Sequence, residues 1–381
     1  MAAADTCDLA ILGGGLSGGL IALAFATLRP DVSVYVVEAG ARIGGNHIWS
    51  FFDSDVSEDA RWLVEPLISH RWPGYDVAFP AHRRGFAQGY NAIESEQFDA
   101  AVRARVPDIV RGEVADHDVT RVTLRGGRTI AAGAVIDARG GGDLSTLDCG
   151  WQKFVGQLLT VEGGHGVALP AVMDATVEQV DGYRFVYLLP FDDARVFVED
   201  TYYSDGPDLD VAAVRARIDA YATVRGWRVT ARGREETGVL PVVIGGDFDA
   251  YWRSTGDGFA KAGVRAGLFH PLTSYSLPRA VDFALHLARQ ERIDGASLAL
   301  ASYAYARANW KAGGFYRMLS KMLFRAADPP ARYRVLERFY RLSPVLIARF
   351  YAGGSTLGDR MRILAGKPPV PIGRALKALA G

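Results

Sequence analysis

Three glycines near the N-terminus have a spacing that can bind the phosphates of a dinucleotide. Gly13, Gly15 and Gly18 form a G-x-G-x-x-G motif, and Glu38 lies 20 residues beyond Gly18. In such a motif the first glycine permits a tight turn, the second lets the backbone approach a pyrophosphate, and the third lets a helix pack closely on a strand. The acid is placed to accept a hydrogen bond from a ribose hydroxyl. These residue types predict a dinucleotide-binding site.

The acidic pair Glu199 and Asp200 could carry proton chemistry. The segment 195–200 is typical of a β-strand, and alternation in a strand puts the two side chains on opposite faces. A carboxylic acid beside an apolar ligand stays protonated because desolvation raises its pKa, and it can then act as a general acid. For the dipeptide alone, solvent-facing acids before a turn are the commoner arrangement.

The elements around the glycines support the phosphate-binding interpretation. Residues 8–12 predict a buried strand, residues 22–28 an alanine-rich helix, and residues 33–37 a second strand that ends on Glu38. The helix N-terminus would present free N–H groups and a partial positive charge to the phosphates. The complete strand, turn, helix and strand are far more specific than the glycines alone, and they predict a Rossmann-like domain.

Two later segments bear on which dinucleotide is bound. The segment 39–47 resembles the stretch after the second strand in FAD-dependent oxidoreductases, where a basic residue and a Gly-Gly pair line the cofactor. This resemblance implies that Arg42, Gly45 and His47 contact FAD. The segment 134–140 is similar to the second flavin-contacting strand of those proteins. Taken alone, it also fits an ordinary core strand followed by a surface turn.

The segment 262–277 resembles the loop that closes the site in many flavin enzymes. It keeps Gly263, His270 and Pro271, but has Val264 where aspartate is usual and Ser274 where glycine is common. The resemblance implies that a helix N-terminus faces the flavin ring and stabilises negative charge on it. The cofactor contacts expected here are Gly263, Arg265, Ala266, Pro271 and Ser274. A glycine-punctuated loop before a helix at 279–288 is the alternative.

Six segments taken together resemble the bacterial carotenoid cyclases that convert lycopene to β-carotene. They are residues 44–51, 69–75, 182–190, 198–203, 238–241 and 265–271. The resemblance extends from residue 8 to about residue 342. It implies an α/β protein of the p-hydroxybenzoate-hydroxylase-like fold, in which a Rossmann-like FAD domain is interleaved with a smaller mixed-sheet substrate domain. The expected FAD domain is 1–75, 90–150 and 255–300, the substrate domain is 76–89 and 151–254, and a basic helical region is 301–381.

The family also implies an unusual chemistry. FAD is required in reduced form, with NADPH as the expected reductant, yet lycopene undergoes no net redox change. The family motif at 198–201 assigns an essential acid to Glu199, and Asp200 is retained as the second catalytic candidate. Arg184, Tyr187, Trp49 and Trp72 could line the substrate tunnel, and all four fit a plain core equally well.

The composition is that of an ordinary soluble protein. The chain has 381 residues, 49% apolar and 23% charged, and no apolar run is long enough to span a membrane. Its two cysteines, Cys7 and Cys149, cannot form a disulfide framework or a four-cysteine zinc site. We therefore expect a cytoplasmic protein without a structural metal or a secretory signal.

The charge is unevenly distributed. From Tyr303 to the C-terminus there are 15 Lys/Arg and three acids, a net charge of +12 that the rest of the chain balances. Residues 309–325 and 331–342 predict helices with an apolar stripe opposite a basic one. Because a hydrocarbon substrate stays in the bilayer, we expect this tail to attach the protein peripherally to the inner face of the cell membrane. Nucleic acid is not expected as a partner, since no known nucleic-acid-binding motif accompanies the positive charge of this region.

Two other functions stay open at this stage. One is a flavin-dependent monooxygenase or dehydrogenase acting on a polyene or another apolar substrate, and the other is a membrane-associated carotenoid-binding flavoprotein. The sequence does not decide the oligomeric state, the reductant, the final base, the β or ε outcome, or whether one or both ends are cyclised.

Overall fold

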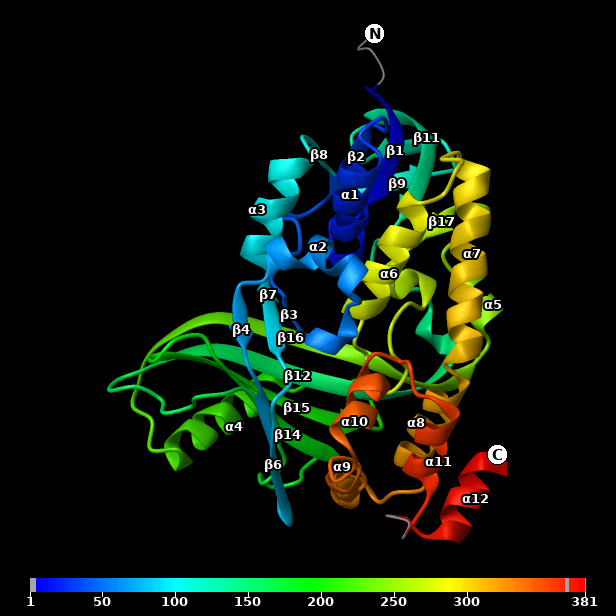
Figure 1. Cartoon of the computed structure of the whole chain (residues 1–381). Helices are drawn as coiled ribbons and strands as arrows, with labels where there is room; N and C mark the ends of the chain where they lie inside the picture. Colours follow the sequence, from blue (N-terminus) through cyan, green and yellow to red (C-terminus); the bar gives the residue numbers. More distant parts are fainter. Residues whose placement is uncertain (1–4, 367–369, 381) are drawn as a thin grey trace.

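The computed structural model of the chain describes residues 5–366 and 370–380. Two seven-stranded sheets dominate it, and a three-stranded sheet joins them. The first sheet lies in the upper half of Figure 1, and the second crosses below it. Helices of the C-terminal region lie beside the second sheet, at the lower right of Figure 1.

The first sheet carries the glycine motif. Its strand order is β8-β2-β1-β11-β10-β9, and β17 pairs with β11. Strands β8, β2, β1, β11 and β17 are parallel, as in a Rossmann-like fold. The strands are β1 Asp5–Leu12, β2 Val34–Glu38, β8 Asp108–Arg111, β9 Val114–His117, β10 Arg121–Leu124, β11 Thr129–Asp137 and β17 Ala260–Lys261.

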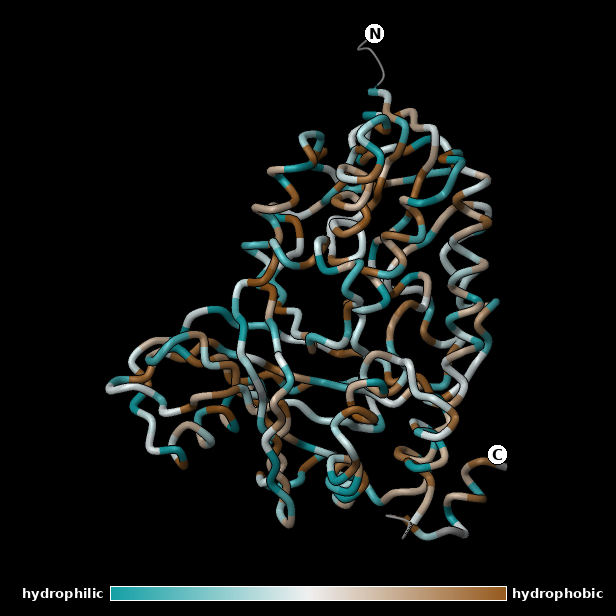
Figure 2. Tube along the Cα trace, in the orientation of Figure 1, coloured by the Kyte–Doolittle hydropathy of each residue, from teal (hydrophilic) through white to brown (hydrophobic). Residues whose placement is uncertain are grey.

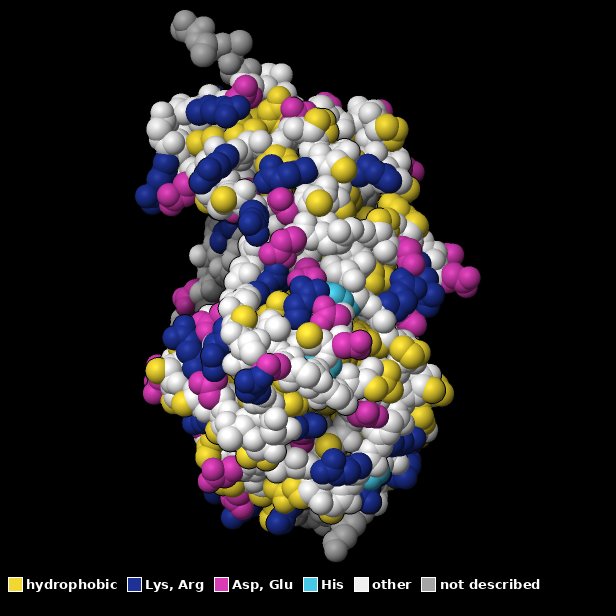
Figure 3. All heavy atoms as spheres, turned by 90° about the vertical axis from the view of Figure 1, so that its left-hand side faces the viewer, with side chains coloured by type: hydrophobic (Ala, Val, Ile, Leu, Met, Phe, Trp, Pro, Cys, Tyr) yellow, Lys and Arg dark blue, Asp and Glu magenta, His cyan; other side chains and the backbone are white. Residues whose placement is uncertain are grey.

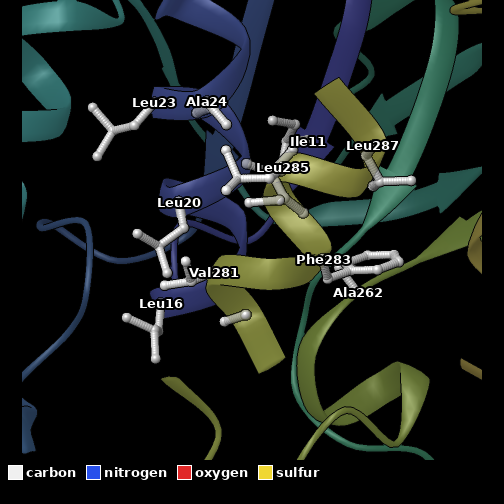
Figure 4. Close-up of a cluster of buried hydrophobic side chains, with 14 of the residues drawn as sticks. Ile11, Leu16, Leu20, Leu23, Ala24, Ala262, Val281, Phe283, Leu285 and Leu287 are labelled. Carbon is white, nitrogen blue, oxygen red and sulfur yellow. The ribbon is translucent and has the colours of Figure 1, made fainter. Parts of the chain in front are cut away.

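Helices α1 (Leu16–Leu28) and α6 (Leu277–Ala288) pack against each other on this sheet (Figure 4). Helix α1 is apolar on nearly every side, because the strands, α6 and α3 (Ser95–Arg105) surround it. Leu20 and Val281 are both fully buried at this contact. The packing fixes the N-terminus of α1 directly above the second sheet.

The second sheet is mostly antiparallel. Its strand order is β16-β12-β15-β14-β13-β5-β6, and only β13 and β5 run parallel. Helix α4 (Val211–Val224) covers one face, where Val198 packs with Val214. The strands are β5 Tyr75–Phe79, β6 His82–Phe86, β12 Leu147–Val161, β13 Ala171–Asp174, β14 Tyr183–Pro190, β15 Arg195–Ser204 and β16 Val229–Gly246.

The remaining elements connect the two large sheets. The small sheet has the strand order β3-β7-β4. Its strands are β3 Ile48–Phe52, β4 His70–Trp72 and β7 Tyr90–Glu94, and the other helices here are α2 Arg61–Val64, α5 Phe248–Arg253 and α7 Gly295–Ala312. Short 3-10 turns cover Asp53–Asp55, Glu58–Ala60, Glu65–Leu67, Leu144–Thr146, Gly263–Ala266 and Pro329–Ala331.

The C-terminal region is helical. Its helices are α8 Gly314–Arg325, α9 Tyr333–Phe339, α10 Pro344–Tyr351, α11 Leu357–Leu364 and α12 Ile372–Ala380. The single helix expected over 309–325 is wrong, because α7 ends at Ala312 and α8 begins at Gly314. Gly313 between them packs closely on Pro271, where a Cβ would come within 3.2 Å of the ring. Arg332, which breaks the predicted stripe, is buried and donates to the carbonyls of Leu323 and Phe324 at the end of α8. None of the helices in the described part of the chain is long and apolar enough to cross a bilayer.

The hydropathy along the trace shows how these layers are held together. Apolar segments run through the strands of both sheets in Figure 2, while the connecting loops are mostly hydrophilic. On the face shown in Figure 3, basic and acidic side chains are interspersed over both halves of the molecule.

Candidate functional site

A cavity of about 420 Å³ lies where the two large sheets meet. The glycine turn contributes Gly15 and Ser17 to its wall, and the loop 273–277 closes one side. The opposite wall is the face of the second sheet turned away from α4, which we call the floor. We refer to this space as the central cavity.

The glycine turn has the geometry that a phosphate site requires. Gly13 adopts a φ of +94°, which L side chains rarely adopt, and this permits the turn after β1. A Cβ at Gly18 would collide with the carbonyl oxygen of Gly13, so helix and strand are in close contact. A Cβ at Gly15 would meet nothing within 4 Å, which leaves the backbone open to the central cavity. The open position at the helix N-terminus fits a pyrophosphate.

The acid at the end of β2 braces this turn. The Glu38 carboxylate accepts hydrogen bonds from the N–H groups of Gly14, at 2.7 Å, and Gly40, at 2.6 Å. Gly45 has a φ of +63°, and the exposed Arg42 pairs with Glu96 at 3.3 Å. Arg42 and Gly45 lie on the loop after β2 and do not line the central cavity.

Only some of the cofactor contacts predicted in the closing loop line the central cavity. Gly263, with a φ of +62°, and Ser274, with a φ of +58°, both line it. The left-handed backbone at Ser274 explains why glycine suits this position in flavin enzymes. Ala266 is buried below the loop, and the carbonyl of Pro271 accepts a hydrogen bond from the N–H of Val243 at 2.9 Å. These two residues therefore hold the loop and do not face the cavity.

Sequence reasoning missed a buried charge cluster that anchors this loop. Asp137 is fully buried at the end of β11, and its carboxylate contacts Arg265 at 2.7 Å, Arg139 at 2.8 Å and His117 at 3.2 Å. Burial alone would raise the pKa of Asp137, but the hydrogen bonds and positive charges hold it well below its usual range. Arg265 thus ties the closing loop to the first sheet. In the sequence, the one sign of this cluster is that the apolar strand 134–136 ends on an acid, Asp137.

On the floor, β15 presents Glu199 to the central cavity. Its neighbours there are Tyr187 on β14 and Phe197 on β15, and Thr201 Oγ1 donates to its carboxyl group at 2.6 Å. Desolvation raises the pKa of Glu199 to about 8, with smaller contributions from the charges of Glu236 and Asp200, while the Thr201 bond opposes the shift. Glu199 is therefore largely protonated at neutral pH and can donate a proton.

The other acid of the pair lies on the opposite face of the sheet. Asp200 is buried on the side of α4 and accepts hydrogen bonds from Arg184 Nε, at 3.0 Å, and Nη2, at 2.6 Å. The sequence placed Asp200 and Arg184 among the catalytic and tunnel candidates, and the structure places neither in the cavity. Trp72 is also in the core, where its indole N–H donates to the carbonyl of Pro190 at 3.1 Å.

Of the aromatic candidates, Tyr187 and Trp49 do line the central cavity. His47 also lines it, and its Nδ1 lies 2.7 Å from a carboxylate oxygen of Glu236 on β16. Glu236 was not identified from the sequence, because it lies in an exposed-looking run of charged residues at 232–236. Only the register of β16 turns it toward the cavity.

The two large sheets, the open glycine turn and the cavity between them define a flavin-enzyme fold of the p-hydroxybenzoate-hydroxylase-like class, as predicted. Solved structures share it. A geranylgeranyl bacteriochlorophyll reductase-like protein from Thermoplasma acidophilum aligns with a TM-score of 0.59 at 14% identity, over 99% of both chains. The 2-methyl-3-hydroxypyridine-5-carboxylic acid oxygenase aligns with a TM-score of 0.61 at 14% identity, over 97% of this chain and 100% of the other.

The chain belongs to the lycopene cyclase family, whose sequence profile, described as lycopene cyclase protein, matches residues 8–377. The lycopene β-cyclase of Pantoea ananas is 44% identical over 98% of this chain and 97% of its own length. That of Paracoccus sp. (strain N81106 / MBIC 01143) is 42% identical over 98% and 97%. The family predicted from the six sequence segments is thus confirmed.

Proposed function

We propose that this protein is a lycopene β-cyclase that works with bound FAD. The observation that carries the proposal is the geometry of one cavity, in which the Glu199 carboxyl group lies on an aromatic floor and the open glycine turn forms the opposite wall. Desolvation there raises the pKa of Glu199 to about 8. The named relatives support lycopene as substrate and β-rings as product. Ring closure leaves the molecular formula unchanged, so the enzyme would be an isomerase.

The residues of the cavity wall fit FAD. The open backbone at Gly15 and the N-terminus of α1 would hold the pyrophosphate, and Glu38 the ribose. Gly263, Ser274 and the N-terminus of α6 would hold the flavin ring. When bound in its reduced, anionic form, the cofactor would supply negative charge beside a carbocation, with NADPH as the proposed reductant.

The chain's own residues would carry the proton chemistry. The Glu199 O–H would protonate the terminal double bond of an acyclic lycopene end, and the next double bond would attack the cation to close a six-membered ring. Tyr187 and Phe197 line the cavity beside Glu199, and their rings would stabilise the positive charge. Loss of a proton from the ring then completes the new double bond. A positioned acid contributes about 10²–10⁴-fold to such a rate.

We assign a separate role to each of the three regions predicted from the sequence. Segments 1–75, 90–150 and 255–300 would bind FAD, while 76–89 and 151–254 would cover the substrate. The region 301–381 would attach the protein to the inner face of the cell membrane, where the hydrocarbon is dissolved. Exposed apolar and basic side chains occur together on α11 and α12, among them Leu376 and Lys377.

Anaerobic incubation with FAD, NADPH and lycopene in liposomes would test the proposal. We expect a product of unchanged mass with absorption at shorter wavelength, and no stoichiometric consumption of NADPH. A product lighter by hydrogen, or one heavier by oxygen in a parallel aerobic incubation, would identify a redox flavoenzyme instead. An unchanged polyene would leave a carotenoid-binding flavoprotein as the explanation.

A further inference from the structure

A second cavity, of about 310 Å³, lies between the second sheet and the C-terminal helices, and we call it the apolar chamber. Met318 and Leu319 of α8 face Leu336 and Phe339 of α9 across it. These are the apolar stripes predicted from the sequence. They border an open space, although apolar stripes on neighbouring helices normally pack directly against each other.

The chamber is built for an uncharged, apolar occupant. Arg338 is the only charged residue in its described lining, and its guanidinium donates to the carbonyls of Ile363 and Ala365. At the rim, Leu364, Leu376 and Leu379 are exposed to solvent while also lining the chamber. Six of the ten exposed large apolar residues in the described part of the chain lie between 345 and 379, so exposed apolar side chains are concentrated in the segment that forms the rim.

The chamber adjoins the central cavity. Thr273 lines both spaces. Along one face of β14, Tyr183 lines the chamber and Tyr187 lines the cavity, with the ring of Phe185 packed between them at centroid distances of 4.9 and 5.1 Å. Tyr275 lines the central cavity and packs on Tyr351 of the chamber at a ring-centroid distance of 5.8 Å, while its hydroxyl contacts with Tyr187 and Tyr90 are 3.4 and 3.5 Å long.

We propose that the apolar chamber binds the acyclic remainder of the polyene hydrocarbon whose end is cyclised at Glu199. The inference rests on the proposed function and extends it. A substrate of about forty carbons needs far more apolar contact than one ring-forming end provides. The chamber offers that contact next to the central cavity, and its rim of exposed leucines would face the lipid. Rotation of Tyr275 would join the two spaces.

Filling the chamber tests this. Leu319→Trp and Leu336→Trp would each place an indole in it, and Leu300→Trp, at an exposed position on α7, is the matched control. Each protein is assayed with lycopene and with a conjugated polyene of about twenty carbons that has the same acyclic end. We expect kcat/KM for lycopene to fall by about ten-fold or more in the filled variants, while that for the short polyene stays near the wild-type value.

Three results would contradict the inference. The filled variants could cyclise lycopene as fast as the control does. They could also lose activity on both substrates equally while still binding FAD. They could also bind liposomes less tightly with no change in substrate preference, which would make the chamber a site for a lipid acyl chain. If the wild-type protein cyclised neither polyene, the proposed function itself would be wrong, and this inference with it.

A separate observation concerns the end of the reaction. Gly156 of β12 is opposite Glu199 of β15 and also opposite Glu236 of β16, so the two carboxyl groups flank it on one face of the sheet. Neighbouring strands lie about 4.8 Å apart, which puts the two acids roughly 10 Å apart at their Cα atoms. The ring of Phe197 fills the space that the missing side chain of Gly156 leaves. Glu199, Phe197 and Glu236 all line the central cavity, so a substrate ring above Phe197 would lie between the two acids.

Glu236 is equipped for the opposite task from Glu199. Its carboxylate is close to His47 Nδ1, at 2.7 Å, and accepts a hydrogen bond from the N–H of Ile48 at 3.1 Å. The His47 side chain is 53% exposed, whereas that of Glu236 is 7% exposed. The histidine thus connects the buried carboxylate to water.

We infer that Glu236 is the base that ends the cyclisation, with His47 as its outlet to solvent. This assignment also rests on the proposed function. A ring C–H bond breaks, its electron pair becomes the ring double bond, and the proton goes to the Glu236 carboxylate. Release through His47 to water, and reloading of Glu199 from water, balance the protons over one turnover. The position of Glu236 would decide which ring carbon loses its proton.

Glu236→Gln tests the assignment, and Glu235→Gln is the control, because Glu235 pairs with Arg215 at the other side of the strand. We expect the Glu236→Gln protein to bind FAD, to turn over about 10²-fold more slowly, and to make rings with the double bond at another position. Glu235→Gln should give the wild-type product. Wild-type rate and product from Glu236→Gln would overturn the assignment, and so would a slower reaction that yields only the wild-type product. A wild-type protein with no cyclase activity would instead count against the proposed function.

Discussion

At the scale of single residues, the acidic pair on β15 shows how strand alternation separates two neighbouring carboxyl groups. Glu199 faces an apolar cavity and has one hydroxyl partner, so its protonated form is favoured. Asp200 faces the α4 side, where Arg184 forks around it. The same dipeptide therefore holds a carboxyl group with a raised pKa, the proposed proton donor, and one half of a buried ion pair.

The raised pKa of Glu199 leads to a pH prediction. Under the proposed function the protonated carboxyl of Glu199 is the active form, so kcat/KM should fall as the pH rises through about 8. Besides desolvation, the pKa of Glu199 is influenced by the Thr201 hydroxyl, by Glu236 on β16 and by Asp200 through the sheet. Steady-state assays across this pH range would show the decrease in kcat/KM. Glu199→Gln should remove activity at every pH while FAD still binds, and an active Glu199→Gln protein would refute the role.

Breaking the buried ion pair between Arg184 and Asp200 should lower stability without abolishing cyclisation. Asp200→Asn would leave the guanidinium of Arg184 buried without its counter-charge, which costs on the order of 3–5 kcal/mol. Urea unfolding should show this decrease, and the folded variant should still make β-rings. If Asp200→Asn were fully stable but inactive, the acid would have been assigned to the wrong residue.

At the scale of elements, different glycines of the turn are needed for folding and for ligand binding. Gly18 lets α1 pack on β1, whereas Gly15 only leaves space at the helix N-terminus. Gly15 has a φ of −66°, which alanine adopts without strain.

Gly15→Ala and Gly18→Ala should consequently differ. We expect Gly15→Ala to unfold at the wild-type urea concentration but to bind FAD more weakly, because its methyl group projects into the phosphate position. Gly18→Ala should lose stability, since its Cβ collides with backbone at Gly13. Flavin fluorescence titration and urea unfolding measure the two effects. Equal FAD affinity in Gly15→Ala and wild type would place the phosphates elsewhere.

At the scale of the whole molecule, the basic charge and the exposed apolar side chains coincide in the C-terminal region. Arg362 and Lys377 are exposed beside Leu364 and Leu376 on α11 and α12. Other basic residues of this region are already paired, such as Arg349 with Asp359 at 2.6 Å. The membrane contact is therefore expected at the rim formed by α11 and α12.

Charge reversal at this rim tests the attachment. Arg362→Glu with Lys377→Glu should weaken binding to anionic liposomes by at least about ten-fold, since each basic residue near such a surface contributes about 1 kcal/mol. Flotation at low and high salt measures this, and Arg105→Glu, exposed on α3 in the upper half of the molecule, is the control. Unchanged flotation of the double variant would exclude this surface.

The sequence by itself determined the family, the fold class and the local units, because these depend on short-range patterns. The spacing of Gly13, Gly15 and Gly18 requires one turn, and alternation along 195–200 already placed Glu199 and Asp200 on opposite faces. The positive φ that glycine usually provides at Ser274 could likewise be anticipated from related loops.

Only the tertiary structure decided what each face meets. The Asp137 cluster combines strands β9 and β11, the turn after β11 and a distant loop, and Glu236 is turned to the cavity by the register of β16. Such long-range contacts cannot be read from a local pattern. The apolar stripes of α8 and α9 were compatible with a core or a membrane. The packing of the helices against the second sheet instead makes them walls of a chamber, because long-range contacts determine which surfaces become enclosed.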